Sequence, residues 1–148
     1  MPSLIPLFLF LHVLAVSAWI AGALWVSGDV KRTLALGKPH LDALAARIGP
    51  AFGLDSIASI ATFATGVLIM WAEGWARPRL GVTLGMIFAV ARAGILGAVR
   101  RSVRVLIARI RAGEVPPPGD PAVKRIGMLS GIAHALWLLA LAGMVFPY

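Results

Sequence analysis

The chain has 148 residues, of which 59% are hydrophobic and 14% are charged, and its formal net charge at pH 7 is +8. A typical soluble domain is about 45–50% apolar and about 25% charged, so this composition argues against a soluble fold and favours a membrane protein. The chain contains no cysteine, which excludes disulfides, thiolate metal sites, iron–sulfur clusters and c-type haem attachment.

Four segments are apolar over the roughly 20 residues that an α-helix needs to cross a bilayer. In chain order they cover residues 3–27, 51–71, 80–98 and 127–146. The first segment lacks a basic start, and its apolar run exceeds the roughly 7–15 residues of a signal-peptide core, so we expect a retained helix. The sequence therefore predicts an all-α, integral membrane four-helix bundle that forms one transmembrane domain over residues 1–148.

Basic residues are concentrated in two of the three connections between these segments. The first connection holds Lys31, Arg32, Lys38 and Arg47, and the third holds Arg100, Arg101, Arg104, Arg109, Arg111, Lys124 and Arg125. The positive-inside rule places both connections in the cytoplasm. We therefore expect a multi-pass protein of a bacterial inner membrane with both termini on the periplasmic side. Anionic lipid headgroups, and not nucleic acid, are then the expected partners of the positive charge.

The third segment continues as a basic amphipathic helix over residues 99–112. Its apolar stripe among arginines is typical either of a helix near lipid headgroups or of a solvated helix end. The proline-rich segment 115–121 ends this helix. A shorter cytoplasmic helix is expected over residues 40–48, with Gly49 and Pro50 at its end.

Ionisable side chains are costly inside a membrane span, so they are candidates for a functional role. His12 lies in the first segment and His134 in the fourth, at depths that differ by only about 5 Å. Two imidazoles at similar depth can ligate one metal centre. A zinc site would lack further ligands, whereas a b-type haem needs only one or two axial side chains and an apolar slot. The alternative is that each histidine forms a hydrogen bond between helices.

The residues around the two histidines suit a flat apolar ligand. Trp19 lies near the helix face of His12, and Gly131 and Trp137 lie near that of His134. Tryptophan rings can line the faces of a macrocycle, and small residues let it approach the helix. The alternative is that the small residues only pack helices together.

Arg92 lies in the third segment, about two turns inside its basic end. It can pair with Asp55 of the second segment, bind a haem propionate, or extend to the headgroups. The same segment carries small residues four apart, which predict close contact with a neighbouring helix in the monomer or across a dimer. Their alternative role is to leave room for a cofactor. These residues are Gly81, Gly85, Ala89, Ala93 and Gly97.

The stretch LHVLAVSAWIAGALWV contains His12, Trp19 and Gly22. It resembles the first helix of the HemJ-type protoporphyrinogen oxidases and of the copper-resistance CopD-like membrane proteins, in which tryptophan follows a histidine by seven residues and small residues come next. Arg79, Leu80 and Gly81 are similar to a basic-Leu-Gly helix start of the HemJ type, with arginine in place of lysine. The resemblance implies a haem-binding four-helix bundle with His12 as an axial ligand.

The hypothesis from the sequence is a b-type haem protein that transfers electrons, as a small cytochrome or a cytochrome subunit. Its alternatives are a HemJ-like protoporphyrinogen oxidase and a non-catalytic structural or transport subunit. We expect a homodimer or a larger respiratory-type complex, and no catalytic residue is assigned. The proposed axial ligands are His12 and His134, and the other cofactor-binding residues are Arg92, Trp19, Trp137 and Gly131.

Overall fold

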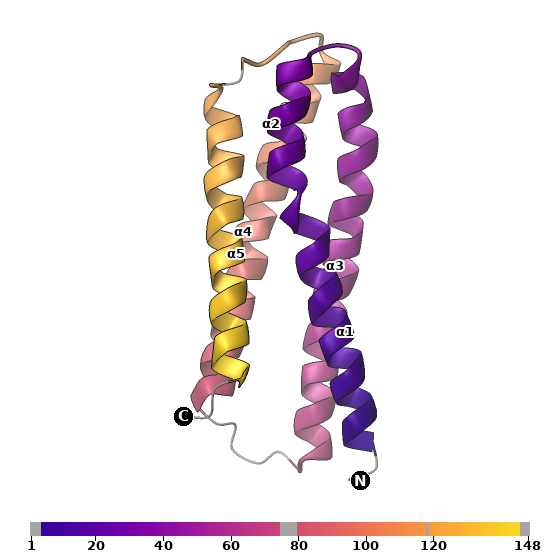
Figure 1. Ribbon diagram of the computed structural model, residues 1–148, viewed down its shortest axis with the longest axis vertical. Coiled ribbons are helices and arrows are strands. Elements are labelled where there is room, and N and C mark those ends of the chain that lie inside the picture. Colours follow the sequence, from indigo (N-terminus) through magenta and orange to yellow (C-terminus); the bar gives the residue numbers. More distant parts are fainter. Residues whose placement is uncertain (1–3, 75–79, 118, 146–148) are drawn as a thin grey trace.

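The computed structural model describes residues 4–74, 80–117 and 119–145, except for the side chains of residues 22 and 23. The described residues form helices and no strand (Figure 1). The helices are α1 (Ile5–Leu24), α2 (Val26–Leu36), α3 (His40–Ala72), α4 (Leu80–Arg111) and α5 (Pro121–Val145). The all-α prediction is therefore confirmed for this part of the chain.

Four helical segments in the described ranges are long and apolar enough to cross a membrane. They are Ile5–Leu36, which joins α1 and α2, and the helices His40–Ala72, Leu80–Arg111 and Pro121–Val145. The first segment is displaced sideways at Trp25, where α1 gives way to α2 (Figure 1). The helices extend beyond the expected spans at the ends that carry the basic residues. The expected outer limits at residues 3 and 146 lie outside the described residues.

The expected helix end at Gly49 and Pro50 is wrong, because α3 runs through both residues. Proline removes one backbone hydrogen bond and crowds the preceding turn. Leu44, Ile48 and Ala51 are nevertheless buried in one core cluster on both sides of Pro50. Since tertiary packing supplies most of the stability of a helix in a protein, this burial favours a continuous helix over the local cost of proline.

The basic extension of the third span is the second half of α4, and its apolar stripe faces the protein core. Arg101 and Arg104 are exposed on the opposite side. The stripe packs with apolar residues of α2, α3 and α5, so it is not free to lie on lipid headgroups. Its buried members are Val99, Val103, Leu106 and Ile110.

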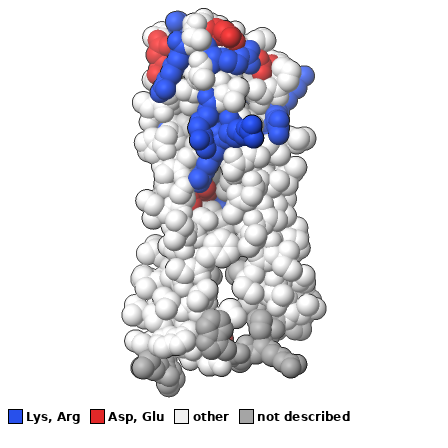
Figure 2. All heavy atoms as spheres, turned by 180° about the vertical axis from the view of Figure 1, so that it is seen from behind, with Lys and Arg blue, Asp and Glu red and all other residues white. Residues whose placement is uncertain are grey.

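The bundle consists of two closely packed helix pairs, α1 with α3 and α4 with α5. The larger core cluster joins the pairs through α2 at the end where the charged residues gather (Figure 2). A smaller cluster around Trp19, Ala58, Ala89 and Ala140 joins them further along. Beyond it the pairs diverge towards the end of the bundle where α1 begins and α5 ends (Figure 1). The surface is hollowed between the two halves there (Figure 2).

The small residues of α4 pack against α5 within the monomer. A Cβ atom added to Gly143 would stand 2.7 Å from the carbonyl oxygen of Gly81. One added to Gly85 would stand 3.0 Å from the carbonyl oxygen of Ala140. Backbones approach this closely only where side chains are absent, so the helix-packing interpretation is confirmed for this half of α4. Gly97, at the other end of the series, has open space around it.

Candidate functional site

His12 is half-buried on α1, and α3 holds its ring. Its Nδ1 atom lies 2.9 Å from the hydroxyl oxygen of Thr65. That hydroxyl is itself 2.7 Å from the carbonyl oxygen of Ala61 and 3.1 Å from that of Thr62. Because a hydroxyl has only one proton and the carbonyls can only accept, Thr65 donates to a carbonyl and accepts from His12 Nδ1–H. The neutral ring then carries its free lone pair on Nε2.

Glycine at position 66 allows the imidazole to lie against the backbone of α3. A Cβ atom added to Gly66 would be 3.5 Å from Cε1 and 3.9 Å from Nδ1 of His12. One edge of the ring is thus fixed by Thr65 and Gly66. The backbone of Thr62 also contributes a hydrogen bond to the His12 ring. A hydrogen bond from Nδ1 to a side chain of a neighbouring helix is of the kind that orients a histidine ligand, with Nε2 as the atom that could bind a metal.

Arg92 is fully buried in the centre of the bundle. Its guanidinium lies over the ring of Trp19, with Cζ 4.3 Å from the ring centroid, and donates to the carbonyl oxygen of Trp19 at 3.2 Å. It also lies 3.6 Å from Asp55 Oδ1, while Arg100 binds the other oxygen of Asp55. The ion pair with Asp55, one of the three alternatives that the sequence left for Arg92, is therefore present. Nε and Nη1 of Arg92 find no hydrogen-bond acceptor among the described residues.

Trp19 is 2% exposed and packs against Arg92, which belongs to the charged cluster of Asp55, Arg92 and Arg100. Its ring meets Phe63 edge-to-face, with centroids 5.9 Å apart. Its indole Nε1 has no hydrogen-bond partner in the described part of the chain. Trp19 therefore stacks on Arg92 and joins α1 to α3 and α4, two turns along α1 from His12.

His134 and Trp137 are half-buried on α5. His134 Nε2 and Trp137 Nε1 are both buried and lack a partner within the described ranges. Buried polar atoms normally have a partner, so two such atoms one turn apart are candidates for contact with a bound group. Gly131 is exposed, and a Cβ atom there would meet nothing within 4 Å.

The candidate residues lie at two levels along the bundle. Trp19 contacts Arg92. On the antiparallel helices α4 and α5, Gly85 lies against Ala140, so Arg92, seven residues along α4, lies near the level of His134. His12 precedes Trp19 by seven residues on α1, which is about 10 Å along the helix axis towards the start of α1. This offset is larger than the depth difference expected between His12 and His134 from the sequence.

Thr65, Gly66 and Arg100 were not among the predicted site residues. Thr65 follows Asp55 by ten residues, so its side chain points about 80° away from that of Asp55 around α3. Its hydroxyl within an apolar span was the available signal for Thr65. Arg100 carried no signal, because it belongs to a run of arginines and its partner lies on another helix.

No group of three or more His, Cys, Asp or Glu side chains that could hold a metal ion occurs in the described part of the chain. No protein-family model, curated protein or solved structure matches the sequence. The residues and the fold therefore define a class, a helical bundle with four segments able to cross a membrane. Arg79, in the second motif of the family resemblance, lies outside the described residues.

Proposed function

We propose that this protein binds a b-type haem in a bacterial inner membrane and transfers electrons as a small cytochrome or cytochrome subunit. The observation that carries the proposal is the arrangement of His12. Its Nδ1 atom is tied to Thr65, so Nε2 keeps the lone pair that a haem iron binds. The haem supplies the electron-transfer chemistry, and the protein supplies ligation, an apolar surrounding and charge.

The described residues fit such a group in three further respects. The molecular surface is hollowed between the two helix pairs in the half of the bundle away from the basic residues (Figure 2). On the α5 side, His134 and Trp137 have buried polar atoms without partners. Arg92 has two unpaired guanidinium nitrogens, which suit a propionate carboxylate in addition to Asp55.

His12 is the main ligand in this proposal. His134 can share the same iron only if the offset of about 10 Å along the bundle axis closes when the cofactor is bound. We therefore expect His12→Ala to abolish haem binding. His134→Ala should change the spectrum and weaken binding, with a smaller effect than His12→Ala.

The test is an absorption spectrum of detergent-purified protein, expressed with added haem precursor, before and after reduction with dithionite. A shifted Soret band with narrow α and β bands supports the proposal. His40→Ala is the matched control, since His40 is exposed at the start of α3 and should leave the spectrum unchanged. A colourless wild-type protein, or equal spectra for wild type and His12→Ala, would refute the proposal.

A structural or transport subunit is the second candidate function. It is favoured by the contacts of His12 with Thr65 and of Arg92 with Trp19 and Asp55, which can serve packing alone. A colourless protein with unchanged thermal stability on addition of haem would support this candidate. Turnover of a porphyrinogen by the coloured protein would instead favour a HemJ-like oxidase.

A further inference from the structure

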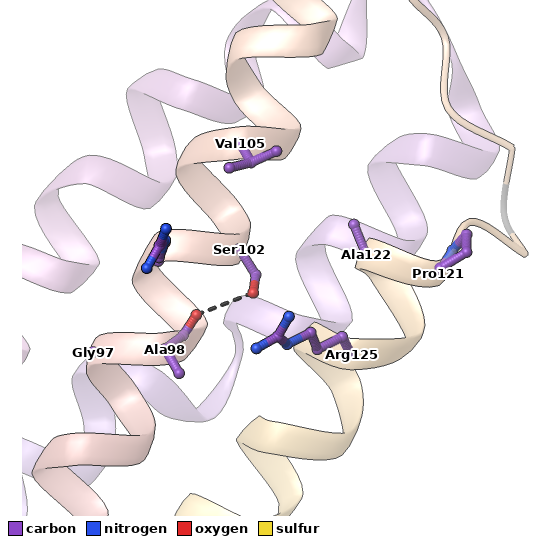
Figure 3. A pocket seen from close by; sticks show the side chains of 8 residues that line it. Gly97, Ala98, Ser102, Val105, Pro121, Ala122 and Arg125 are labelled. Carbon is purple, nitrogen blue, oxygen red and sulfur yellow. Dashed lines mark hydrogen bonds between the residues drawn. The ribbon is translucent and has the colours of Figure 1, made fainter.

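A groove separates α4 from α5 near the charged end of the bundle (Figure 3). Its volume is about 850 Å³, which is within the range of roughly 300–1,000 Å³ for small-molecule sites. Arg101 and Ser102 line it from α4, and Ala122 and Arg125 line it from α5. The side chain of Arg125 extends from α5 towards α4 (Figure 3).

The two arginines of the groove have no counter-charge in the described part of the chain, unlike Arg100 and Arg109 on α4, which form ion pairs. Neither Arg101 nor Arg125 has an ion pair or hydrogen bond with a described residue. Asp120, directly before α5, is already bound by Arg109 and by the backbone N–H of Ala122. The groove therefore has two positive charges and no carboxylate free to neutralise them.

The position of the groove along the helices matches the headgroup level of a bilayer. About 20 residues separate Arg101 from the start of α4, and about 20 separate Arg125 from the end of α5. At about 1.5 Å per residue each stretch is roughly 30 Å long, the thickness of the hydrocarbon core. If these stretches span the membrane, both guanidinium groups lie at the level of the lipid phosphates.

Below the arginines, the groove is lined by small and apolar groups. Gly97 and Ala98 lie one turn deeper on α4 than Arg101, and a Cβ atom added to Gly97 would meet nothing within 4 Å. The hydroxyl of Ser102 donates to the carbonyl oxygen of Ala98 at 3.0 Å (Figure 3), so it presents no free donor to the groove. This surface suits an acyl chain.

We propose that this groove is a binding site for one anionic phospholipid. Arg101 and Arg125, on two different helices, hold its phosphate, and the small residues below them hold the first part of an acyl chain. Basic pockets between membrane-spanning helices are suited to anionic headgroups for this reason. The site depends on the protein's residence in a membrane but not on haem binding.

The test is native mass spectrometry of the detergent-solubilised protein with phosphatidylglycerol or phosphatidylcholine of identical acyl chains. We expect wild type to bind phosphatidylglycerol at least about tenfold more tightly, and the double variant Arg101→Gln/Arg125→Gln to lose this preference. The matched control is Arg32→Gln/Lys38→Gln, which removes two charges from the same end of the bundle outside the groove. The control should keep the preference.

If the control variant lost the preference for phosphatidylglycerol to the same extent, the attraction would be nonspecific to the charged end, and the proposed site would be refuted. An unchanged preference in the groove variant would do the same. A competition arm separates lipid from free anion: millimolar inorganic phosphate should not displace phosphatidylglycerol, and displacement would overturn the assignment of a lipid. Thermal unfolding without added lipid should be equal for wild type and the groove variant, because both arginines are exposed on the surface.

Discussion

Among single residues, Thr65 gives the most direct test of the proposed His12 ligand. Thr65→Val removes the hydroxyl that accepts from Nδ1 and keeps the size of the side chain. Loss of a group that orients a metal ligand typically costs about 10–100-fold in affinity, so we expect weaker haem retention by that factor. Haem titration followed by absorbance measures the change.

Thr62→Val is the matched control for Thr65→Val. The Thr62 hydroxyl lies on the same helix and donates only to the carbonyl oxygen of Ala58, at 2.8 Å. Its removal should leave haem affinity within about twofold of wild type, because no hydrogen bond to His12 is lost. Equal weakening by both substitutions would mean that Thr65 acts through the packing of α3 and not through the imidazole.

Asp55 is the anionic partner of the buried Arg92 and of the partly exposed Arg100. The side chains of Asp55 and Arg92 are 2% and 0% exposed, so Asp55→Asn leaves a buried cation without its counter-charge. Breaking a buried pair in this way typically costs about 3–5 kcal/mol. Thermal unfolding in detergent should show a large loss of stability. Asp29→Asn, which breaks an exposed pair with Arg47, should cost about 1 kcal/mol or less.

Among the helices, α4 and α5 depend on close backbone contact. Gly143→Ala places a methyl group 2.7 Å from the backbone oxygen of Gly81, which cannot move without shifting α4. Overpacking of this kind costs about 1–3 kcal/mol, and thermal unfolding should detect it. Gly94→Ala is the control, because its Cβ would meet nothing within 4 Å and alanine favours a helix. A stable Gly143→Ala variant would contradict the described packing of these two helices.

The stability that Asp120 gives to the start of α5 should depend on pH. The backbone N–H of Ala122 and the guanidinium of Arg109 favour the carboxylate and hold the pKa of Asp120 below its usual range. Its contribution to stability is therefore complete above the unfolded pKa of about 3.9 and is lost as the pH falls through the lower folded pKa. Asp120→Ala should lower the unfolding temperature at pH 7. The difference from wild type should shrink below about pH 4; a difference that is constant with pH would exclude the charged form as the cause.

Hydropathy and the spacing of small residues were sufficient to predict the number of long helices and the contact face of α4. They failed at Pro50, because a local rule about proline gives no information on the core contacts of Leu44 and Ile48. They also failed to predict that the stripe along Val99 and Val103 is buried. An amphipathic pattern shows that one face is apolar, but it does not tell whether protein or lipid covers that face.

For the molecule as a whole, sequence patterns identified the ionisable residues of the candidate site but did not predict how they are arranged. His12, Arg92 and His134 stand out because ionisable groups are rare in apolar segments. Their relative heights depend on the register between helix pairs, which is set by contacts such as Arg92 on Trp19. The pattern of residues within one helix cannot predict the register between two helix pairs. The roughly 10 Å offset between His12 and the Arg92 level therefore required the three-dimensional structure.

The orientation of the molecule is a prediction that its charge distribution allows to be tested directly. Lysines and arginines gather at the end that holds the α4–α5 connection (Figure 2), so we expect that end to face the cytoplasm. Because the chain has no cysteine, a single introduced thiol reports one position. Glu114→Cys lies in that connection, and Glu73→Cys lies at the opposite end of the bundle, just after α3.

A membrane-impermeant maleimide applied to intact bacterial spheroplasts should label Glu73→Cys and not Glu114→Cys. Permeabilisation should make both react. The reverse pattern would place the basic end outside, because Glu73 and Glu114 lie beyond opposite ends of the spanning helices. The groove of Arg101 and Arg125 would then meet the outer leaflet, and its anionic lipid would have to come from there. Equal labelling before permeabilisation would contradict a membrane-spanning bundle altogether.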